Sequence, residues 1–448
     1  MFSRILIANR GEIALRILRT CKELGIETVI AYSKADKNAL YLEYADAHVC
    51  VGPGESAESY LNIPSIISAA EIADIEAIHP GYGFLAENSH FAEVCESSNI
   101  VFIGPNSDVM NKMGNKTLAR NIAIENKIPV IPGSESTIDD QQQAIEVAHK
   151  IGYPILIKAS FGGGGRGMRV AHNDISLVNA IAVAKREAQV AFNDSSIYIE
   201  KYIEPSRHIE VQIVADKYGN IVHLGERDCS IQRRHQKLVE QAPSPNISDQ
   251  LREDICKSAI KLAKAVNYTN VGTVEFLVDT EGNHYFIEMN TRLQVEHPVT
   301  EMLTGIDLVK EQIRIASGER LNLRQKKIKS EGVAIECRIN AEDPDNDFRP
   351  HAGKITMCNA PGGKGVRVDS HVYSGYEVPP YYDSLLGKLI VHQKGREEAI
   401  ACMKRALSEY RIEGIKTTIP LHLKIISDSR FATGDIDTHF VENLIAEK

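Results

Sequence analysis

The chain of 448 residues is too long for one ordinary hydrophobic core, and 43% hydrophobic with 25% charged residues is typical of a globular protein, so we expect two to four domains. No apolar run approaches the roughly 20 residues that span a bilayer, which excludes an integral membrane protein, and the formal net charge of −9 disfavours nucleic acid as a partner. The eight cysteines form no CxxC pair, which argues against a disulfide framework and a zinc site. The N-terminus lacks the apolar region and cleavage site of a signal peptide, so we expect a cytoplasmic protein.

Short β-branched runs alternate with amphipathic helical stretches from residue 1 to about 113. The runs lie at 5–7, 28–30, 77–78 and 101–103, and the helical stretches at 12–24 and 59–73. This alternation predicts a doubly wound parallel sheet with functional loops at the carboxyl ends of its strands. One such loop is His79-Pro-Gly-Tyr-Gly83.

The pattern changes after residue 113. A helix is expected at 116–126, followed by strands around 155–158, 168–170, 197–203, 209–214, 272–278 and 284–289, which together indicate an α+β domain up to about residue 330. The remainder, 331–448, has a hairpin signal at 361–365 and two helices near 396–410 and 418–427. It is interpreted as a smaller, mixed β-rich domain.

Four consecutive glycines, Gly162 to Gly165, are the strongest local signal. Each costs about 0.5–1 kcal/mol of backbone entropy relative to alanine, which favours a role such as close approach to phosphates. Gly162, Gly164 and Gly167 match GxGxxG, but a strand-like Met168-Arg-Val170 follows where a dinucleotide-binding fold needs a helix. The run also lacks the ending of a Walker A loop. We therefore expect a strand-loop-strand flap over ATP phosphates; the alternative is a flexible surface turn.

A predicted hairpin at 272–290 carries two carboxylates. If its turn centres on Glu281-Gly282, Glu275 lies directly opposite Glu288. At about 5 Å and an effective dielectric near 20 the two charges repel by roughly 3 kcal/mol, which favours a cation between them. Magnesium prefers such oxygen ligands, and Asn290 lies on the same face. The alternative is a solvated strand whose register differs by one residue.

Polar residues occupy the even positions of the segment that follows, Glu288, Asn290, Arg292, Gln294 and Glu296, and mostly apolar residues occupy the odd ones. This period of two predicts that the strand continues to about residue 298, usually as a half-exposed strand. Beside a metal site, the Arg292 guanidinium would suit a planar oxyanion and Glu296 a general base.

A basic cluster at 227–237 brings five cationic or potentially cationic side chains into an acidic protein. Alone it is as compatible with a solvated face as with a site, but next to an ATP flap it favours neutralisation of phosphate and other small anions. His208 and Arg338 carry weak signals, and from spacing alone each would be structural.

Six segments together closely resemble biotin carboxylase, the ATP-grasp component of biotin-dependent carboxylases, over nearly the whole chain. They lie at 7–14, 79–88, 158–168, 226–235, 288–300 and 379–384. The resemblance implies an N-terminal Rossmann-like domain at 1–113, an ATP-grasp domain at 114–330 with a lid at about 131–203, and a C-terminal domain at 331–448. Gln241, where a second Glu is frequent, and Lys364, where an apolar residue is common, depart from the family pattern.

The resemblance also implies the nucleotide and metal ligands. Those for ATP are Lys116, Lys158, Gly163, Gly164, Gly165, Gly167, Met168, Glu200, Lys201, Ile203, His208, Gln232, His235 and Leu277. Glu275 and Glu288, with Asn290 beside them, would hold Mg²⁺ or Mn²⁺, with two ions expected.

For the reaction, the resemblance implies that Arg292, Gln294 and the backbone of Val295 bind bicarbonate. Glu296 would remove the proton of bicarbonate, and the bicarbonate would then attack the γ-phosphate of ATP and form carboxyphosphate. Arg338 would stabilise the enolate-like oxygen of biotin, and Tyr82 and Lys237 would line the same pocket.

The expected partners are a biotin carboxyl carrier protein, carboxyltransferase subunits and a second copy of the chain. Acetyl-CoA, for fatty acid synthesis, is the first expectation for the final acceptor, with pyruvate or another acyl-CoA as alternatives. Two other functions stay open: another ATP-grasp ligase that works through an acyl phosphate, and a noncatalytic nucleotide-binding regulator.

Overall fold

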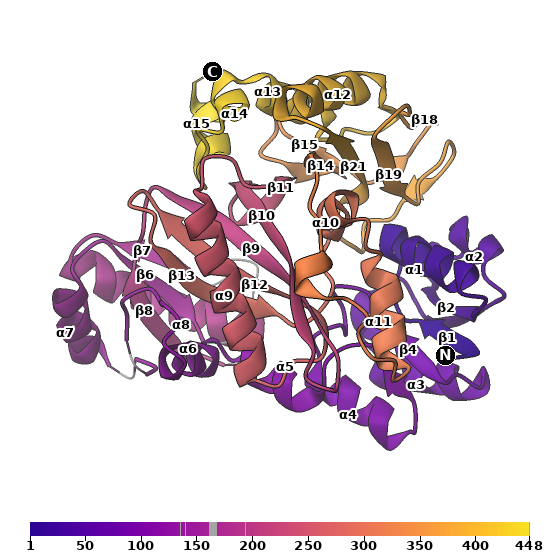
Figure 1. Cartoon of the computed structure of the whole chain (residues 1–448), viewed down its shortest axis with the longest axis horizontal. Coiled ribbons are helices and arrows are strands. Elements are labelled where there is room, and N and C mark those ends of the chain that lie inside the picture. The colour runs from indigo at the N-terminus through magenta and orange to yellow at the C-terminus, as the bar shows by residue number, and fades with distance from the viewer. Residues whose placement is uncertain (135, 139, 161–167, 193, 448) are drawn as a thin grey trace.

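The computed structural model describes residues 1–134, 136–138, 140–160, 168–192 and 194–447 (Figure 1). The predicted flap residues Gly163, Gly164, Gly165 and Gly167 therefore lie outside the described residues. No helix in the described ranges combines the length and the apolar composition needed to cross a membrane.

Five parallel strands form the N-terminal sheet in the order β3-β2-β1-β4-β5. Ile5 and Ile7 pack in the core on the side of α1, whereas Leu6 packs in the core on the other face. Both faces of this central strand are covered, so the predicted doubly wound sheet is confirmed. The strands are β1 (Arg4–Ile7), β2 (Glu27–Ser33), β3 (Ala47–Gly52), β4 (Ala77–His79) and β5 (Val101–Phe102).

Helices connect these strands. The helix expected over 59–73 begins only at Ile63, because the Asn62 side chain accepts a hydrogen bond from the Ser65 N–H and caps the helix there. The helices of this region are α1 (Gly11–Glu23), α2 (Tyr41–Tyr44), α3 (Ile63–Ile72), α4 (Ser89–Ser97) and α5 (Ser107–Gly114), with short 3₁₀ turns at η1 (Lys34–Asp36) and η2 (Ser56–Glu58).

A small antiparallel sheet, β7-β6-β8, lies to one side in Figure 1. Buried residues of α7 and α8 pack on it, so it has a core of its own. Its elements are α7 (Gln141–Ile151), β6 (Ile155–Ala159), β7 (Arg169–Ala171), α8 (Asp174–Phe192) and β8 (Ile197–Lys201). In the sequence, the glycine run falls between β6 and β7.

An eight-stranded sheet in the order β13-β12-β9-β10-β11-β14-β21-β19 forms the centre of the molecule. Its antiparallel pairing continues from β11 into β14, where Val239 pairs with Cys337. The central and C-terminal regions therefore share one sheet. Its strands are β9 (Ser206–Ala215), β10 (Ile221–Arg233), β11 (Gln236–Ala242), β12 (Asn270–Asp279), β13 (His284–Asn290), β14 (Val333–Asn340), β19 (Val366–Ser370) and β21 (Leu385–Gln393).

Helices and short strands surround this sheet. The predicted helices at 116–126, 396–410 and 418–427 are present with nearly the expected bounds. The helices are α6 (Lys116–Glu125), α9 (Asp249–Ala265), α10 (His297–Thr304), α11 (Leu308–Ala316), η3 (Gln325–Lys327), α12 (Arg396–Glu409), α13 (Ile419–Ser427), α14 (Ser429–Thr433) and α15 (Phe440–Ala446). The short strands are β15 (Glu342–Asp343), β16 (Arg349–Pro350), β17 (Gly353–Lys354), β18 (Met357–Asn359), β20 (Glu377–Val378) and β22 (Arg411–Glu413).

The β12–β13 hairpin has the predicted pairing of Glu275 with Glu288, but it reaches that pairing by another route. The turn is one residue longer than expected, because the Asp279 N–H bonds to the Asn283 carbonyl. A bulge then shifts the register between Glu275 and Phe276, which pairs with Phe286. The bulge cancels the longer turn, so the two carboxylates still lie opposite each other.

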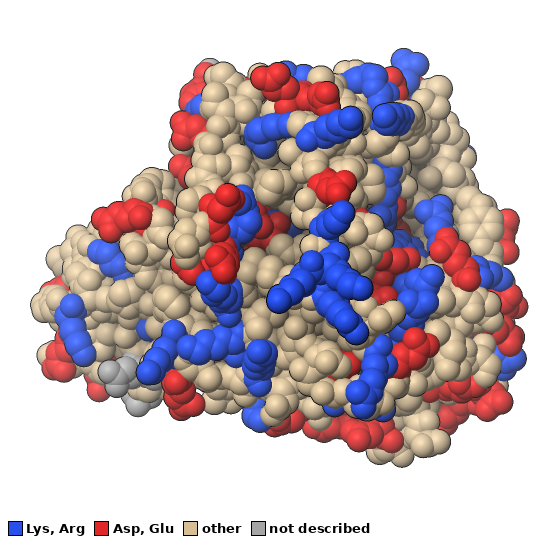
Figure 2. Space-filling view, viewed as in Figure 1, with Lys and Arg blue, Asp and Glu red and all other residues tan. Residues whose placement is uncertain are grey.

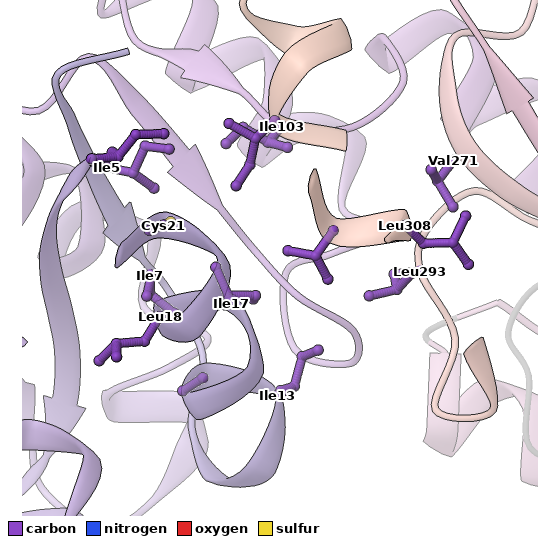
Figure 3. Packing of buried hydrophobic residues seen from close by; sticks show 14 of the residues in the cluster. Ile5, Ile7, Ile13, Ile17, Leu18, Cys21, Ile103, Val271, Leu293 and Leu308 are labelled. Atoms are coloured by element: carbon purple, nitrogen blue, oxygen red, sulfur yellow. The ribbon is translucent and has the colours of Figure 1, made fainter. Parts of the chain in front are cut away.

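The prediction that the strand continues to residue 298 is wrong. β13 ends at Asn290, and α10 begins at His297 with Pro298 in its first turn. Leu293 leaves the sheet and packs fully buried with Val271 and Leu308, in a core that extends from α1 and β1 (Figure 3). The alternation of polar and apolar residues therefore does not mark a strand here. It marks a segment, called the 291–296 segment, whose apolar Leu293 side chain enters the core.

Candidate active site

Charged side chains of both signs are spread over the face of the molecule in Figure 2. The charges that distinguish a site are therefore the buried ones, because burying an unpaired charge is costly. A row of four charged side chains, three of them buried and Glu288 half-buried, crosses four neighbouring strands. Arg227 pairs with Glu210, Glu210 with Glu275, and Glu275 with Glu288.

Lys237 balances this row from β11. Its ammonium donates to Glu210, to Glu275 at 2.9 Å and to Glu296 at 2.7 Å. Burial would lower the pKa of Lys237, but the three carboxylates outweigh burial and hold it well above its ordinary value. His208 adds a second contact to Glu275 at 3.0 Å. The structure thus places protein cations around the carboxylates, where the sequence predicted only a metal.

Arg227 is a fully buried partner for several site residues. Its guanidinium donates to Glu210 at 2.6 Å and to the Gln294 side chain at 2.9 Å, and also to Gln212, Thr300 and Thr273. Gln294 in turn donates to Glu275 at 2.9 Å. The Gln294 amide is therefore fixed in orientation on both sides.

Glu296 lies between two cations. Lys237 approaches one carboxylate oxygen, and Arg338 the other at 3.0 Å. Burial would raise the pKa of Glu296, but Lys237, Arg338 and Arg227 together lower it, so that the carboxylate is ionised. Arg338 also donates to Glu240 at 2.6 Å, although burial still raises the pKa of Glu240 to about 7.

The 291–296 segment is held from the N-terminal region. The Glu87 carboxylate accepts hydrogen bonds from the Thr291 N–H at 3.0 Å and from Arg292 Nε at 2.8 Å. Arg292 also donates to Asn290 Oδ1 at 3.0 Å, and Asn290 donates to Glu275 at 2.9 Å. Arg292, Asn290 and Glu275 are thus brought together as the sequence predicted.

Some of the predicted nucleotide residues lie on the small sheet, and others lie on strands of the large sheet. Lys116 pairs with Glu288 at 3.0 Å, and buried Lys158 forms an ion pair with Glu200 across β6 and β8. Lys201 turns its ammonium to the carbonyls of Gly152 and Tyr153, so its side chain holds β8 to the turn before β6. Of the other predicted residues, Leu277 pairs with His208 on the neighbouring strand, Gln232 pairs with Lys237, His235 occupies the β10–β11 turn, Met168 precedes β7 and Ile203 follows β8.

Tyr82 has a different neighbour from the one that its predicted role suggests. Its hydroxyl donates to Glu12 of α1, which pairs with buried Lys388 at 2.9 Å. No described residue joins the Tyr82 hydroxyl to Arg338 by a hydrogen bond. Arg338 lies opposite Lys388 in the β14–β21 pairing. Tyr82 and Arg338 are therefore connected through Glu12 and Lys388 in one charged network.

Glu210, Glu87, Glu12 and Lys388 were not singled out by sequence reasoning. Glu210 carried a usable signal, since His208, Glu210 and Gln212 alternate with Ile209, Val211 and Ile213 and so predict a polar strand face. Lys388 carried none, because a lone lysine in an apolar strand gives no hint of its distant partners.

A fully buried carboxyl group, Glu336, leads to a prediction about stability. Both of its oxygens lack a hydrogen-bond partner among the residues that the structure describes, and it lies opposite Glu240. Burial raises its pKa well above the ordinary value of 4.5. Above pH 4.5 the unfolded chain releases a proton that the folded chain keeps. The free energy of unfolding therefore decreases as the pH rises above 4.5.

We expect Glu336→Gln, which cannot ionise, to raise the midpoint of thermal unfolding at about pH 8 by about 2 °C more than at about pH 5.5. Calorimetric scans of wild type and variant at the two pH values measure this difference. Glu398→Gln on the exposed face of α12 serves as the matched control. An equal shift at both pH values would contradict a neutral Glu336.

Comparison with known families covers most of the chain. Residues 1–110 match the family model "Biotin carboxylase, N-terminal domain", residues 115–324 "Carbamoyl-phosphate synthase L chain, ATP binding domain" and residues 336–443 "Biotin carboxylase C-terminal domain". Biotin carboxylase 1 of Bacillus subtilis is 56% identical over 99% of this chain and 98% of its own. A pyruvate carboxylase subunit of Methanothermobacter thermautotrophicus is 54% identical over 99% of this chain and 90% of its own.

Two solved structures are similar over the full length. The biotin carboxylase complex from Campylobacter jejuni with a β,γ-ATP compound has a TM-score of 0.97 and 51% identity, and the match covers 99% of each chain. The biotin carboxylase domain dimer of Hydrogenobacter thermophilus 2-oxoglutarate carboxylase, in complex with MgADP, ADP and bicarbonate, has a TM-score of 0.96 and 50% identity over 99% of this chain and 98% of that one.

Proposed function

The chain belongs to the biotin carboxylase family, whose members are ATP-dependent ligases, and from that premise we propose that the buried cluster around Glu296 activates bicarbonate. One observation carries the proposal. The Glu296 carboxylate is kept ionised between Lys237 and Arg338, at the end of the 291–296 segment, which also carries Arg292. An ionised base beside a guanidinium suits proton removal from a bound anion.

In the proposed first step bicarbonate lies against Arg292, Gln294 and the backbone N–H of Val295. Glu296 takes the bicarbonate proton, and the freed oxygen attacks the γ-phosphorus of ATP. The bond from that phosphorus to the β-phosphate oxygen breaks, ADP leaves, and carboxyphosphate forms. Arg292 is oriented for this role by Glu87 and Asn290, which limits its freedom before substrate binds.

The donor set of Glu275, Glu288 and Asn290 fits a hard divalent cation. Two carboxylates in register are the oxygen ligands that Mg²⁺ or Mn²⁺ prefers. The Asn290 amide, whose nitrogen donates to Glu275 and whose oxygen accepts from Arg292, would turn its oxygen toward the metal. We propose that these residues hold the metal, with two ions expected. When bound, the metal would neutralise charge on the ATP phosphates. Lys116, paired here with Glu288, would then be available to the phosphates.

The remaining nucleotide contacts are assigned to the small sheet and its surroundings. We propose that Lys158 holds phosphate beneath the flap of Gly163, Gly164, Gly165 and Gly167. Lys158 and Glu200 already form a buried ion pair, which supports a preformed pocket. The others proposed to contact ATP are Met168, Lys201, Ile203, His208, Gln232, His235 and Leu277.

In the second step carboxyphosphate decomposes to carbon dioxide and phosphate. Phosphate takes the proton from the ureido nitrogen of biotin, and this nitrogen attacks carbon dioxide. Arg338 stabilises the negative charge on the ureido oxygen, and Tyr82 and Lys237 line the pocket. The position of Arg338 beside Glu296 supports this assignment, because bicarbonate activation and biotin carboxylation would then take place at neighbouring positions.

We propose that biotin is presented by a separate carrier protein, that the chain forms a homodimer and that it works in the cytoplasm. For the final acceptor we propose acetyl-CoA, which a separate carboxyltransferase would carboxylate for fatty acid synthesis. Relatives with similar identity serve other carboxylases, as the pyruvate and 2-oxoglutarate carboxylase names indicate. Purification of the native complex and assay of its transferase with the three acceptors tests the choice, and exclusive use of pyruvate or 2-oxoglutarate would overturn it.

The activity itself has a direct test. We expect ATP cleavage that requires bicarbonate and Mg²⁺ and that free biotin stimulates by about tenfold or more, since only biotin consumes the carboxyl group productively. Release of phosphate, with and without each component, measures it. Stimulation by glutamine or another amino acid in place of biotin would indicate a different ATP-grasp ligase.

A further inference from the structure

Among the backbone N–H groups of the 291–296 segment, that of Val295 is distinguished by how the two carbonyls beside it are held. Within the ranges that the structure describes, no group accepts a hydrogen bond from it. The two carbonyls on either side of it are both held by fully buried side chains. Gln294 O lies 2.7 Å from His297 Nδ1, and Val295 O lies 2.9 Å from Lys388 Nζ.

The peptide between Gln294 and Val295 carries both the Gln294 carbonyl and the Val295 N–H. It is a trans peptide, and in a planar trans peptide the C=O and N–H point in opposite directions. A side chain that fixes the Gln294 carbonyl therefore also fixes the direction of the Val295 N–H. His297 is that side chain, and its backbone N–H also donates to the Gln294 carbonyl, at the longer distance of 3.3 Å.

The chemistry of His297 is set by its surroundings. Gln294 O can only accept, so Nδ1 must carry the proton. Burial, together with Lys388, Arg16 and Arg367, lowers the pKa of His297 well below its ordinary value, which keeps the ring neutral. Its Nε2 has no hydrogen-bond partner among the described residues, although a Glu301 oxygen lies 4.0 Å away. The single donor of the ring is thus used on the Gln294 carbonyl.

Lys388 acts on the next peptide and comes from the other end of the chain. Its ammonium is fully buried and pairs with Glu12 at 2.9 Å. Asp369 and Arg338 lie opposite it on the neighbouring strands. A buried ammonium with a carboxylate partner is a strong donor to a carbonyl, so it holds the peptide that follows Val295.

We propose that His297 and Lys388 are positioning residues that aim the Val295 N–H at the bound oxyanion, without touching it. This rests on the proposed function, in which the Val295 N–H contacts bicarbonate. Donors aimed before the substrate arrives stabilise an anion without reorganisation during the reaction. Loss of either residue should therefore weaken bicarbonate binding more than nucleotide binding.

Two substitutions at His297 separate this role from simple packing. An asparagine amide nitrogen occupies roughly the place of Nδ1, and a glutamine amide nitrogen that of Nε2. We expect His297→Asn to keep the KM for bicarbonate within about threefold of wild type and His297→Gln to raise it by about tenfold or more, with the Kd for ADP nearly unchanged in both. Bicarbonate-dependent phosphate release and calorimetric titration of ADP provide the two readouts.

A control variant and a second set of substitutions make the test independent of whether each His297 variant folds. His392→Asn removes a similar histidine contact, from Nε2 to the Glu331 carbonyl at 2.7 Å, and should leave the KM for bicarbonate unchanged. The double variant Lys388→Met, Glu12→Gln removes the buried pair together and should raise that KM selectively, even if His297→Gln fails to fold.

Three results are decisive. Equal KM values for bicarbonate in His297→Asn and His297→Gln would overturn the inference while the proposed function stands. Equal loss of ADP and bicarbonate affinity in the double variant would also overturn it. Absence of bicarbonate-dependent ATP cleavage in the wild-type protein would overturn the proposed function and the inference with it.

Discussion

Arg338→Ala should lower biotin-dependent ATP cleavage by about 10²- to 10³-fold, which is the usual cost of losing a donor to a developing oxyanion. Arg338 lies beside Glu296 and Glu240, and Lys116 and Lys158, the proposed phosphate-binding lysines, have other partners. We therefore expect the Kd for ADP to stay within about threefold of wild type. Carboxybiotin formation and titration of ADP measure the two effects.

The control for Arg338→Ala is Arg430→Ala, which breaks ion pairs to Asp428 and Glu447 near the C-terminus and should change neither readout. Slow bicarbonate-dependent ATP cleavage without biotin should survive in Arg338→Ala, because Lys237 still holds Glu296 ionised. If nucleotide affinity fell as far as carboxylation, the arginine would have a structural role and the proposed contact with biotin would be wrong.

Local patterns predicted the elements that depend on local interactions. The apolar run at Ile5 to Ile7 predicted a covered parallel strand, and the structure confirms it. The register of Glu275 with Glu288 was also right, yet the turn that led to it was wrong by one residue. A bulge was needed to restore the pairing, and a bulge has no reliable sequence signal when no glycine marks it.

The continuing strand after Asn290 failed for a tertiary reason. The sequence alternates in polarity there, but Glu87 holds the Thr291 N–H and Leu293 enters a core shared with the N-terminal region. Neither interaction can be inferred from the segment itself. The same limit applies to Lys388 and Glu12, which are 376 positions apart and meet only because the shared sheet brings β21 against α1.

The roles of the site residues stay predictions, but their charge balance has a consequence for acid sensitivity. The pKa values of both Glu275 and Glu296 are lowered, despite burial, by Lys237 together with His208 for the first and Arg338 for the second. A lowered carboxyl pKa contributes stability that is present above the value in the unfolded chain and is lost as the pH falls toward the folded value. Glu336 acts in the opposite direction, so stability should be highest between these limits.

Glu296→Gln should have the largest effect of any single substitution in this cluster. We expect bicarbonate-dependent ATP cleavage to fall by about 10³-fold whether biotin is present or not, since general bases contribute about 10²- to 10⁴-fold. Glutamine has nearly the same shape but cannot accept the bicarbonate proton. Lys237 would keep its contacts with Glu210 and Glu275, so the fold and the Kd for ADP should change little. Single-turnover phosphate release measures the loss.

The two catalytic substitutions are expected to differ in kind, and this difference separates the half-reactions. Arg338→Ala should lose only the step that needs biotin, whereas Glu296→Gln should lose the step that precedes it. Glu296 contacts both Lys237 and Arg338, so a base that served only to hold Arg338 in place would give the same phenotype in both variants. Retention of biotin-independent ATP cleavage in Glu296→Gln would therefore identify Glu296 as a positioning residue and exclude it as the base.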